Sequence, residues 1–261
     1  MSEPSSKRQK TEPPEITLVY WPGMPGRGEH VRLAFEAAGV EYGDTALQKD
    51  CVDKVLAHIS DKNIGDDFSP PPFAPPILRH GDLTISQVPN ILLYLGPKLG
   101  LVPENDPNGV YYVNGLALTA LDGLSNEAHD VHHPVATTLY YEDQKDEALR
   151  KAEDYRNNRL PKFLGYFERV LSSEPSKGGE YLYAGQLTYA DLVLFQCLDG
   201  VTFAFPNYIK KVRDSDKYPK VWALYERVKG HERIKNYLAS ERRQEYSLCI
   251  WRNYPELDEQ P

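Results

Sequence analysis

The chain contains 261 residues, of which 41% are hydrophobic and 26% charged, and its formal net charge is −8. This composition is typical of a folded globular protein and argues against a disordered or collagen-like chain. The acidic balance, without a sustained basic stripe, disfavours nucleic acid as the main partner. No apolar run reaches the roughly 18 residues of a membrane span, and no secretory signal follows Met1. The three widely spaced cysteines cannot form a disulfide framework, so we expect a cytoplasmic protein.

The first residues of the chain differ in composition from the rest. Residues 1–14 are polar and contain prolines without apolar periodicity, which predicts a disordered tail. The run Lys7-Arg8-Gln9-Lys10 within this tail fits a nuclear-import signal, but short basic runs in tails more often serve only solubility. The folded part of the chain is therefore predicted to begin at residue 15.

Residues 15–97 carry the pattern of a small α/β domain with the element order β-α-β-α-β-β-α. Ile16–Trp21 is a β-branched and aromatic run, which indicates a buried strand, and a Pro/Gly-rich turn follows it. The next pattern is helical and is expected to end at Gly39. Apolar residues at i, i+3, i+4 and i+7 predict a helix over Cys51–Ile59. The tripeptide at residues 80–82 (His-Gly-Asp) separates two short apolar runs and predicts a hairpin.

The remainder of the chain is predicted to be helical. The helix that starts at Asn90 is expected to end at Gly96, and Thr188 and Asp191 have the spacing of a helix capping box. Apolar periodicity predicts further helices over residues 110–131, 142–172, 188–203, 219–229 and 231–239. The predicted organisation is a tail (1–14), an α/β domain (15–97), a linker (98–109), an all-helical domain (110–245) and a C-terminal extension (246–261).

This architecture, together with the residues in particular turns, resembles the cytosolic glutathione transferases, in particular tyrosine-type members from fungi and bacteria. The matching stretches cover most of residues 16–240 and read LVYWPGMPGRGEHVRLAFEAAGVEY, APPILRHGDLTISQVPNILLYLG, YAGQLTYADLVLF and YPKVWALYERVKGHERIKNYL. The resemblance implies an α/β + all-α fold, in which a thioredoxin-like glutathione-binding domain precedes an all-helical substrate domain. It also implies a cytoplasmic homodimer that uses glutathione as a co-substrate and needs no resident cofactor.

Tyr20 lies at the end of the first predicted strand, where the resemblance places the catalytic hydroxyl. A free thiol has a pKa of about 8.5, so only a few per cent of glutathione is thiolate at neutral pH. A phenol that donates a hydrogen bond to the sulfur favours the thiolate. No cysteine lies near residues 20–30, which disfavours relatives with a catalytic cysteine. We predict that Tyr20 is catalytic; the alternative is a strand aromatic without a catalytic role.

The resemblance also implies the positions that bind glutathione. Arg27 opens a helix, whose N-terminus favours anions. Pro76 matches a cis-proline, and Pro75 before it offers a carbonyl but no N–H to the cysteinyl part of the ligand. Gln87 matches a glutamine that reaches the γ-glutamyl end, where Val88 replaces the usual Ser or Thr and retains only its backbone N–H. The departures at Pro75 and Val88 imply weaker glutathione binding or a differently seated peptide.

Acidic side chains on the first helix of the second domain are further candidates. In some classes an acid from this helix contacts the glutathione ammonium across the dimer interface, and Asp122 and Glu127 match that place. The alternative, solvated helix charges, is the more common role of such residues.

Tyr111, Tyr112 and His129 lie on the same predicted helical run and are candidates for the cavity that holds the second substrate. His129 and His133 also have an i, i+4 spacing that a metal site could use. Pro134 breaks the helix there and no further ligand is evident, so no metal is predicted.

The predicted function is conjugation of the glutathione thiolate to a small apolar electrophile, a detoxifying reaction. Two alternatives remain at this stage. One is a non-catalytic glutathione-transferase-like binding or scaffold protein, which the residues at positions 75 and 88 favour. The other is a specialised glutathione-dependent isomerase or biosynthetic tailoring enzyme on the same scaffold.

Overall fold

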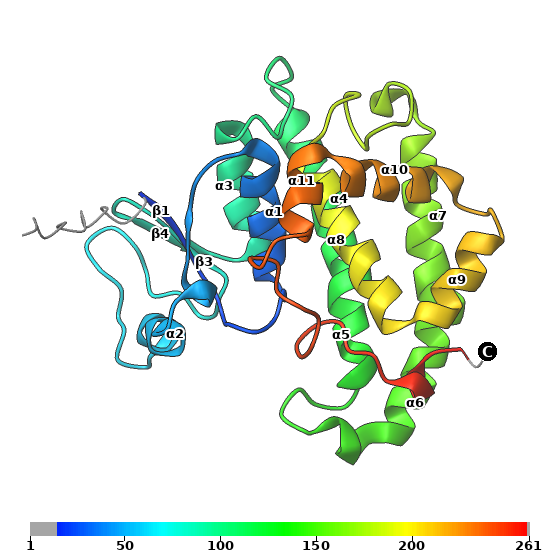
Figure 1. Ribbon diagram of the computed structural model, residues 1–261, viewed down its shortest axis with the longest axis horizontal. Helices are drawn as coiled ribbons and strands as arrows, with labels where there is room; N and C mark the ends of the chain where they lie inside the picture. The colour runs from blue at the N-terminus through cyan, green and yellow to red at the C-terminus, as the bar shows by residue number, and fades with distance from the viewer. Residues whose placement is uncertain (1–14, 260–261) are drawn as a thin grey trace, which may run out of the picture.

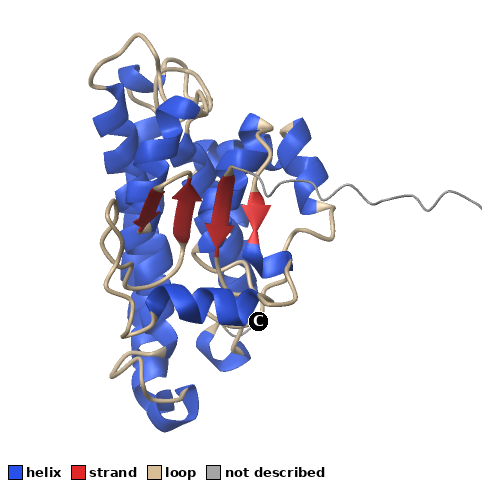
Figure 2. Cartoon of the chain, turned by 90° about the vertical axis from the view of Figure 1, so that its left-hand side faces the viewer, coloured by secondary structure: helices blue, strands red, loops and turns tan. Residues whose placement is uncertain are grey.

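The computed structural model describes residues 15–259. The predicted tail, with the basic run at residues 7–10, lies outside the described residues. The first domain is built on a four-stranded sheet with the strand order β2-β1-β3-β4 (Figure 2). Strand β1 (Ile16–Val19) pairs in parallel with β2 (Gly43–Asp44) and antiparallel with β3 (Ile77–His80). Strand β4 (Leu83–Ser86) completes the predicted hairpin with β3.

Helices cover both faces of this sheet, because successive residues of a strand point to opposite sides. Leu18 and Leu78 face helices α1 (Gly28–Ala38) and α3 (Val88–Lys98). Their strand neighbours Val19 and Ile77 face the opposite side, where they pack on helix α2 (Cys51–Ile59). Figure 1 shows α1 between the sheet and the helical domain, so this helix belongs to both cores.

The structure confirms one of the predicted helix ends, at Gly39, and corrects another, at Gly96. Gly39 caps α1 as predicted: its φ of 69° is left-handed, and its N–H bonds the carbonyls of Phe35 and Glu36. The predicted end at Gly96 is wrong, since α3 continues to Lys98. A Cβ on Gly96 would lie 2.7 Å from the Tyr189 ring, so this glycine permits close packing between two helices rather than ending one.

The second domain is helical throughout. Its elements are α4 (Gly109–Ala120), a π-helical turn (Leu121–Asn126), α5 (Glu127–His132), α6 (Lys145–Asp154), a second π-helical turn (Tyr155–Arg159), α7 (Leu160–Leu171), α8 (Tyr189–Ala204), α9 (Pro206–Asp214), α10 (Pro219–Gly230) and α11 (Glu232–Leu238). Sequence analysis missed α9. Only Tyr208 and Ile209 are buried in this short polar helix, so its apolar signal is weak.

Helix α8 is the centre of the helical domain, and most of its side chains are buried. The predicted capping box is present: the Thr188 hydroxyl and backbone N–H bond Asp191 at 2.7 and 2.8 Å. Burial raises the pKa of the Asp191 carboxyl to about 6. No single helix within residues 15–259 is both long and apolar enough to cross a membrane; α8 and α9 meet that test only as a pair, with a bend of 116° between them.

After α11 the chain returns across the molecule as an extended segment, residues 240–259, which we call the C-terminal strap. In Figure 1 it runs from α11 between α1 and α5 and ends beside α6. Trp251 anchors it: its side chain is fully buried, and its indole N–H donates to the Leu124 carbonyl at 3.1 Å. A Cβ on Gly200 would lie 2.1 Å from the Trp251 ring, so only glycine leaves room for this anchor.

Candidate active site

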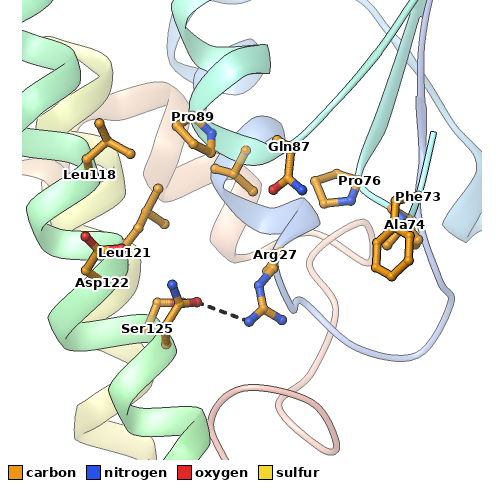
Figure 3. Close-up of a pocket in the computed structure, with 13 residues that line it drawn as sticks. Arg27, Phe73, Ala74, Pro76, Gln87, Pro89, Leu118, Leu121, Asp122 and Ser125 are labelled. Atoms are coloured by element: carbon orange, nitrogen blue, oxygen red, sulfur yellow. Dashed lines mark hydrogen bonds between the residues drawn. The ribbon is translucent and has the colours of Figure 1, made fainter. Parts of the chain in front are cut away.

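A cavity of about 400 Å³ lies between the two domains (Figure 3). One wall comes from the first domain: the start of α1, the loop before β3 and the start of α3. The opposite wall comes from the end of α4 and the π-helical turn that follows it. The lining residues are Arg27, Phe73, Ala74, Pro75, Pro76, Gln87, Val88, Pro89, Leu118, Leu121, Asp122, Ser125 and Asn126.

All five predicted glutathione-binding residues line this cavity. The peptide bond between Pro75 and Pro76 is cis, and β3 begins at the next residue. Gln87 has a φ of 75°, a left-handed conformation that is uncommon for a residue other than glycine and is often found at functional sites. Val88 is the first residue of α3, so its backbone N–H has no partner within the helix.

Charged groups occupy two places in the cavity wall. The Arg27 guanidinium reaches across the domain boundary and donates to Asn126 Oδ1 at 3.1 Å. Asp122 lies on the π-helical turn of the same chain, and its side chain is exposed. π-Helical turns are frequent at functional sites. With the N-terminus of α3, these groups give the cavity both a positive and a negative side.

The Tyr20 hydroxyl is not among the groups that line the cavity. Tyr20 is 2% exposed, and its oxygen accepts a hydrogen bond from the Arg27 backbone N–H at 2.7 Å. Cys249 of the C-terminal strap lies on the other side of the hydroxyl, with its Sγ 3.9 Å from the Tyr20 oxygen. Burial, and next the neighbouring Cys249, raise the pKa of Tyr20 well above the usual value for a phenol. The hydroxyl that the sequence predicts to be catalytic is therefore covered by the protein itself in the structure.

Comparisons with known proteins agree with this architecture. The sequence profile of the glutathione S-transferase C-terminal domain matches residues 129–241. A Plasmodium falciparum glutathione S-transferase is 27% identical over 232 residues, which span 88% of this chain and 98% of the relative. Glutathione S-transferase 2 of Onchocerca volvulus is 28% identical over 84% of this chain and 90% of the relative. Over most of its length the chain is therefore similar to glutathione S-transferases.

Solved structures agree on the fold. The Pi-class glutathione S-transferase of Onchocerca volvulus superposes with a TM-score of 0.63 at 23% identity, over 85% of this chain and 91% of that one. The glutathione S-transferase of Ascaris lumbricoides gives the same TM-score over 87% and 97%. This glutathione S-transferase fold is the predicted α/β + all-α arrangement. The relatives named here are from a malaria parasite and nematodes, so they lend no support to the predicted likeness to fungal and bacterial members.

The two acids predicted for a cross-dimer contact have different surroundings in the structure. Asp122 lines the cavity of its own chain. Glu127 forms an ion pair with Arg159, whose Nε and Nη2 donate to the carboxylate oxygens at 2.7 and 2.5 Å. Because the Glu127 carboxylate is already paired and partly buried, it is poorly placed to bind a ligand ammonium. Of the two acids, Asp122 is therefore the better candidate for that contact.

The three residues predicted to contact the second substrate are not among the residues that line the interdomain cavity. Tyr111 and Tyr112 are 70% and 56% exposed on α4, and the Tyr112 ring packs against Tyr183. His129 packs against the rings of His132 and His133. Burial, and next the nearby Arg27 charge, lower the pKa of His129 to about 4. Across residues 15–259, no group of three or more His, Cys, Asp or Glu side chains is placed to hold a metal ion.

Sequence reasoning missed the helical wall of the cavity apart from Asp122. Leu118, Leu121 and Ser125 share one helix face with Asp122, at the spacing i, i+3, i+4 and i+7, so this signal was present in the sequence. Asn126 lies on the same face, at i+8. What the periodicity does not predict is its contact with Arg27, which is 99 residues away in the chain.

Proposed function

We propose that the protein is a glutathione transferase, which joins the sulfur of glutathione to a small electrophile. The observation that carries this proposal is the pairing of opposite charges with backbone hydrogen-bonding groups around one interdomain cavity. Glutathione is a tripeptide whose γ-glutamyl end holds both an ammonium and a carboxylate. The curated relatives that carry the glutathione S-transferase name support the same activity.

We assign the ligand contacts as follows. The γ-glutamyl carboxylate lies at the N-terminus of α3, where the Gln87 amide and the Val88 backbone N–H can donate to it. Its ammonium lies toward Asp122 of the same chain. The Pro75 carbonyl accepts from the cysteinyl N–H, and the positive charge of Arg27 favours the thiolate.

The reaction requires the thiolate form of glutathione. Tyr20 is proposed as the donor to the sulfur, since a hydrogen bond to the anion lowers the pKa of the thiol. The thiolate then attacks the electrophilic carbon, a carbon–sulfur bond forms, and the leaving group departs with the electron pair. Leu118, Leu121 and Phe73 line the cavity with apolar surface and suit a small apolar electrophile.

A non-catalytic glutathione-binding protein is the rival that one observation favours, because the Tyr20 hydroxyl is covered in the structure. The two are distinguished by isothermal titration with glutathione and by conjugation to 1-chloro-2,4-dinitrobenzene. Binding with turnover supports the transferase, binding without turnover supports the rival, and no binding contradicts both.

The ligand assignment has its own test. Asp122→Asn should raise the Kd for glutathione about tenfold, the loss of one charge-assisted contact. Asp130→Asn is the matched control, since Asp130 is exposed on the neighbouring helix α5 and does not line the cavity. Equal effects of the two changes would contradict the contact.

We also propose that the protein is a cytoplasmic homodimer. The loop before β3 exposes three apolar side chains, Ile64, Phe68 and Phe73, which are 88%, 73% and 90% exposed. Exposed apolar clusters commonly mark interaction surfaces. Sedimentation equilibrium should give a mass of twice 29.7 kDa, and a monomer at micromolar concentration would contradict the proposal.

A further inference from the structure

The C-terminal strap contacts the turn that precedes helix α1. Gln244 Oε1 accepts from the Gly23 backbone N–H at 2.9 Å, and the Ser247 hydroxyl donates to the Gly23 carbonyl at 2.8 Å. Two residues further on, Cys249 reaches the Tyr20 hydroxyl. The strap therefore lies over the turn between β1 and α1 and over the phenol that ends that strand.

Both hydrogen-bonding contacts that the structure gives the Tyr20 hydroxyl are made to groups of the protein itself. Its oxygen accepts from the Arg27 backbone N–H, and a Cβ on Gly26 would lie 2.2 Å from it. The second contact within residues 15–259 is with Cys249 Sγ at 3.9 Å, in which either the hydroxyl or the thiol can donate. The protein's own thiol thus makes with Tyr20 the contact that the proposed reaction assigns to the thiol of glutathione.

The strap is held firmly on both sides of Cys249, at Tyr246 and at Trp251, and lightly between them. Ile250 and Trp251 are 1% exposed, and the Ile250 carbonyl lies 3.0 Å from His132 Nε2. Ser247 and Leu248 are exposed, and Leu248 has 60% of its side chain accessible. Cys249 itself has a φ of 79°, which is unfavourable for a residue other than glycine. Tyr246, by contrast, bonds Gln196 and Asp199 and stacks on Phe203. A movement confined to residues 247–249 can therefore free the phenol while Tyr246 and Trp251 stay in place.

We infer that residues 247–249 form a gate, in which the Cys249 thiol contacts the Tyr20 hydroxyl until glutathione displaces it. The inference rests on the proposed function, because the competing thiol is that of glutathione. Its consequence is that part of the binding energy of glutathione is used to open the gate.

The gate is tested by the rate at which iodoacetamide alkylates Cys249 in the full-length protein. Cys51 and Cys197 are 2% and 0% exposed, and a Cys249→Ala control assigns the reactive thiol. S-methylglutathione serves as the ligand, because its sulfur can still accept a hydrogen bond from Tyr20 but carries no thiol that would consume the reagent. We expect saturating ligand to raise the alkylation rate of Cys249 at least threefold. An unchanged or slower rate overturns the inference.

Steady-state kinetics give a second readout. Cys249→Ala removes the competitor, so the KM for glutathione should fall at least threefold with little change in kcat. Cys249→Ser keeps a hydrogen-bonding group and should remain close to wild type. Glu245→Ala is the matched control, because this exposed residue of the strap precedes the gate. A KM unchanged in Cys249→Ala, or lowered equally in Glu245→Ala, overturns the gate.

The experiments give different results if only the gate is absent and if the proposed function is wrong. A protein that binds and conjugates glutathione, but whose Cys249 reactivity ignores the ligand, retains the proposed function and lacks the gate. A protein that does not bind S-methylglutathione in calorimetry lacks both.

Discussion

The backbone N–H of Arg27 donates to the hydroxyl oxygen of Tyr20 over 2.7 Å. This bond ties the phenol to the first turn of α1, where the helix dipole favours negative charge. Two glycines make the approach possible, since a Cβ on Gly26 or Gly28 would lie within 2.6 Å of Tyr20 atoms. The bond thus fixes the position of the Tyr20 oxygen and leaves the hydroxyl proton able to donate to a second group.

Tyr20→Phe removes that proton and keeps the ring. A hydrogen bond to a charged group contributes about 1.5–3 kcal/mol, so kcat/KM for conjugation should fall about 10- to 100-fold. The pKa of the bound glutathione thiol should rise toward its free value of about 8.5, as followed by the ultraviolet absorbance of the thiolate. Tyr166→Phe, on α7 and remote from the cavity, is the control. An unchanged pH–rate profile would contradict a catalytic Tyr20.

Pro75→Ala restores a backbone N–H beside the cavity. Proline has no such donor, so the cysteinyl carbonyl of glutathione lacks a partner there in the wild type. One added hydrogen bond contributes about 1 kcal/mol, which predicts a Kd for glutathione about fivefold lower by calorimetry. Pro72→Ala, in the same loop but outside the cavity lining, should leave the Kd unchanged. A higher Kd in Pro75→Ala would mean that the ligand backbone does not pair with this residue.

The stability of the protein should depend on pH through its buried histidines. His30 is fully buried, neither of its ring nitrogens has a hydrogen-bond partner among the described residues, and burial lowers its pKa to about 3. Between about pH 6.5 and 3 the unfolded chain binds a proton at this position and the folded chain does not. The free energy of unfolding should therefore fall as the pH falls, by about 2 kcal/mol for His30 between pH 7.5 and 5.

Urea unfolding of a His30→Leu variant at these two pH values checks the contribution. In His30→Leu the loss of stability on acidification should be about 2 kcal/mol smaller than in the wild type. The control is His58→Gln, in a partly exposed position, for which the loss should equal that of the wild type. His132, whose pKa burial also lowers to about 3, contributes in the same direction in every variant. An equal loss in wild type and His30→Leu would show that His30 is protonated in the folded state.

Gly200→Ala should release the anchor of the C-terminal strap. The added Cβ would lie 2.1 Å from the Trp251 ring, and overpacking of this kind costs about 1–3 kcal/mol. We expect that loss in urea unfolding, together with a red-shifted tryptophan emission. Gly115→Ala in α4 is the control: its Cβ meets open space, so replacing a helical glycine should stabilise the protein by about 0.5–1 kcal/mol. Two variants of equal stability would contradict a tight Trp251 contact.

Local patterns predicted the local structure well. The helix over residues 51–59 and its bounds follow from apolar periodicity, and the capping box of α8 follows from two residues. Gly96 was misjudged because its packing partner, Tyr189, is distant in the chain. The covered Tyr20 hydroxyl has the same cause, since Cys249 is 229 residues away and no periodicity reports such a contact. The predicted ligand positions share one cavity because they lie in neighbouring turns of the same domain.

The network around Glu29 has a consequence for the synthesis of the chain. This carboxylate is fully buried on α1, and Arg32 of the same helix lies 3.2 Å from it. Its other partners come from the far end of the sequence: the Tyr237 hydroxyl donates to it at 2.7 Å, and Arg243 pairs with it and with Asp199. On the ribosome, the first domain emerges long before these partners do. Its native packing therefore completes only when the last part of the chain has been released.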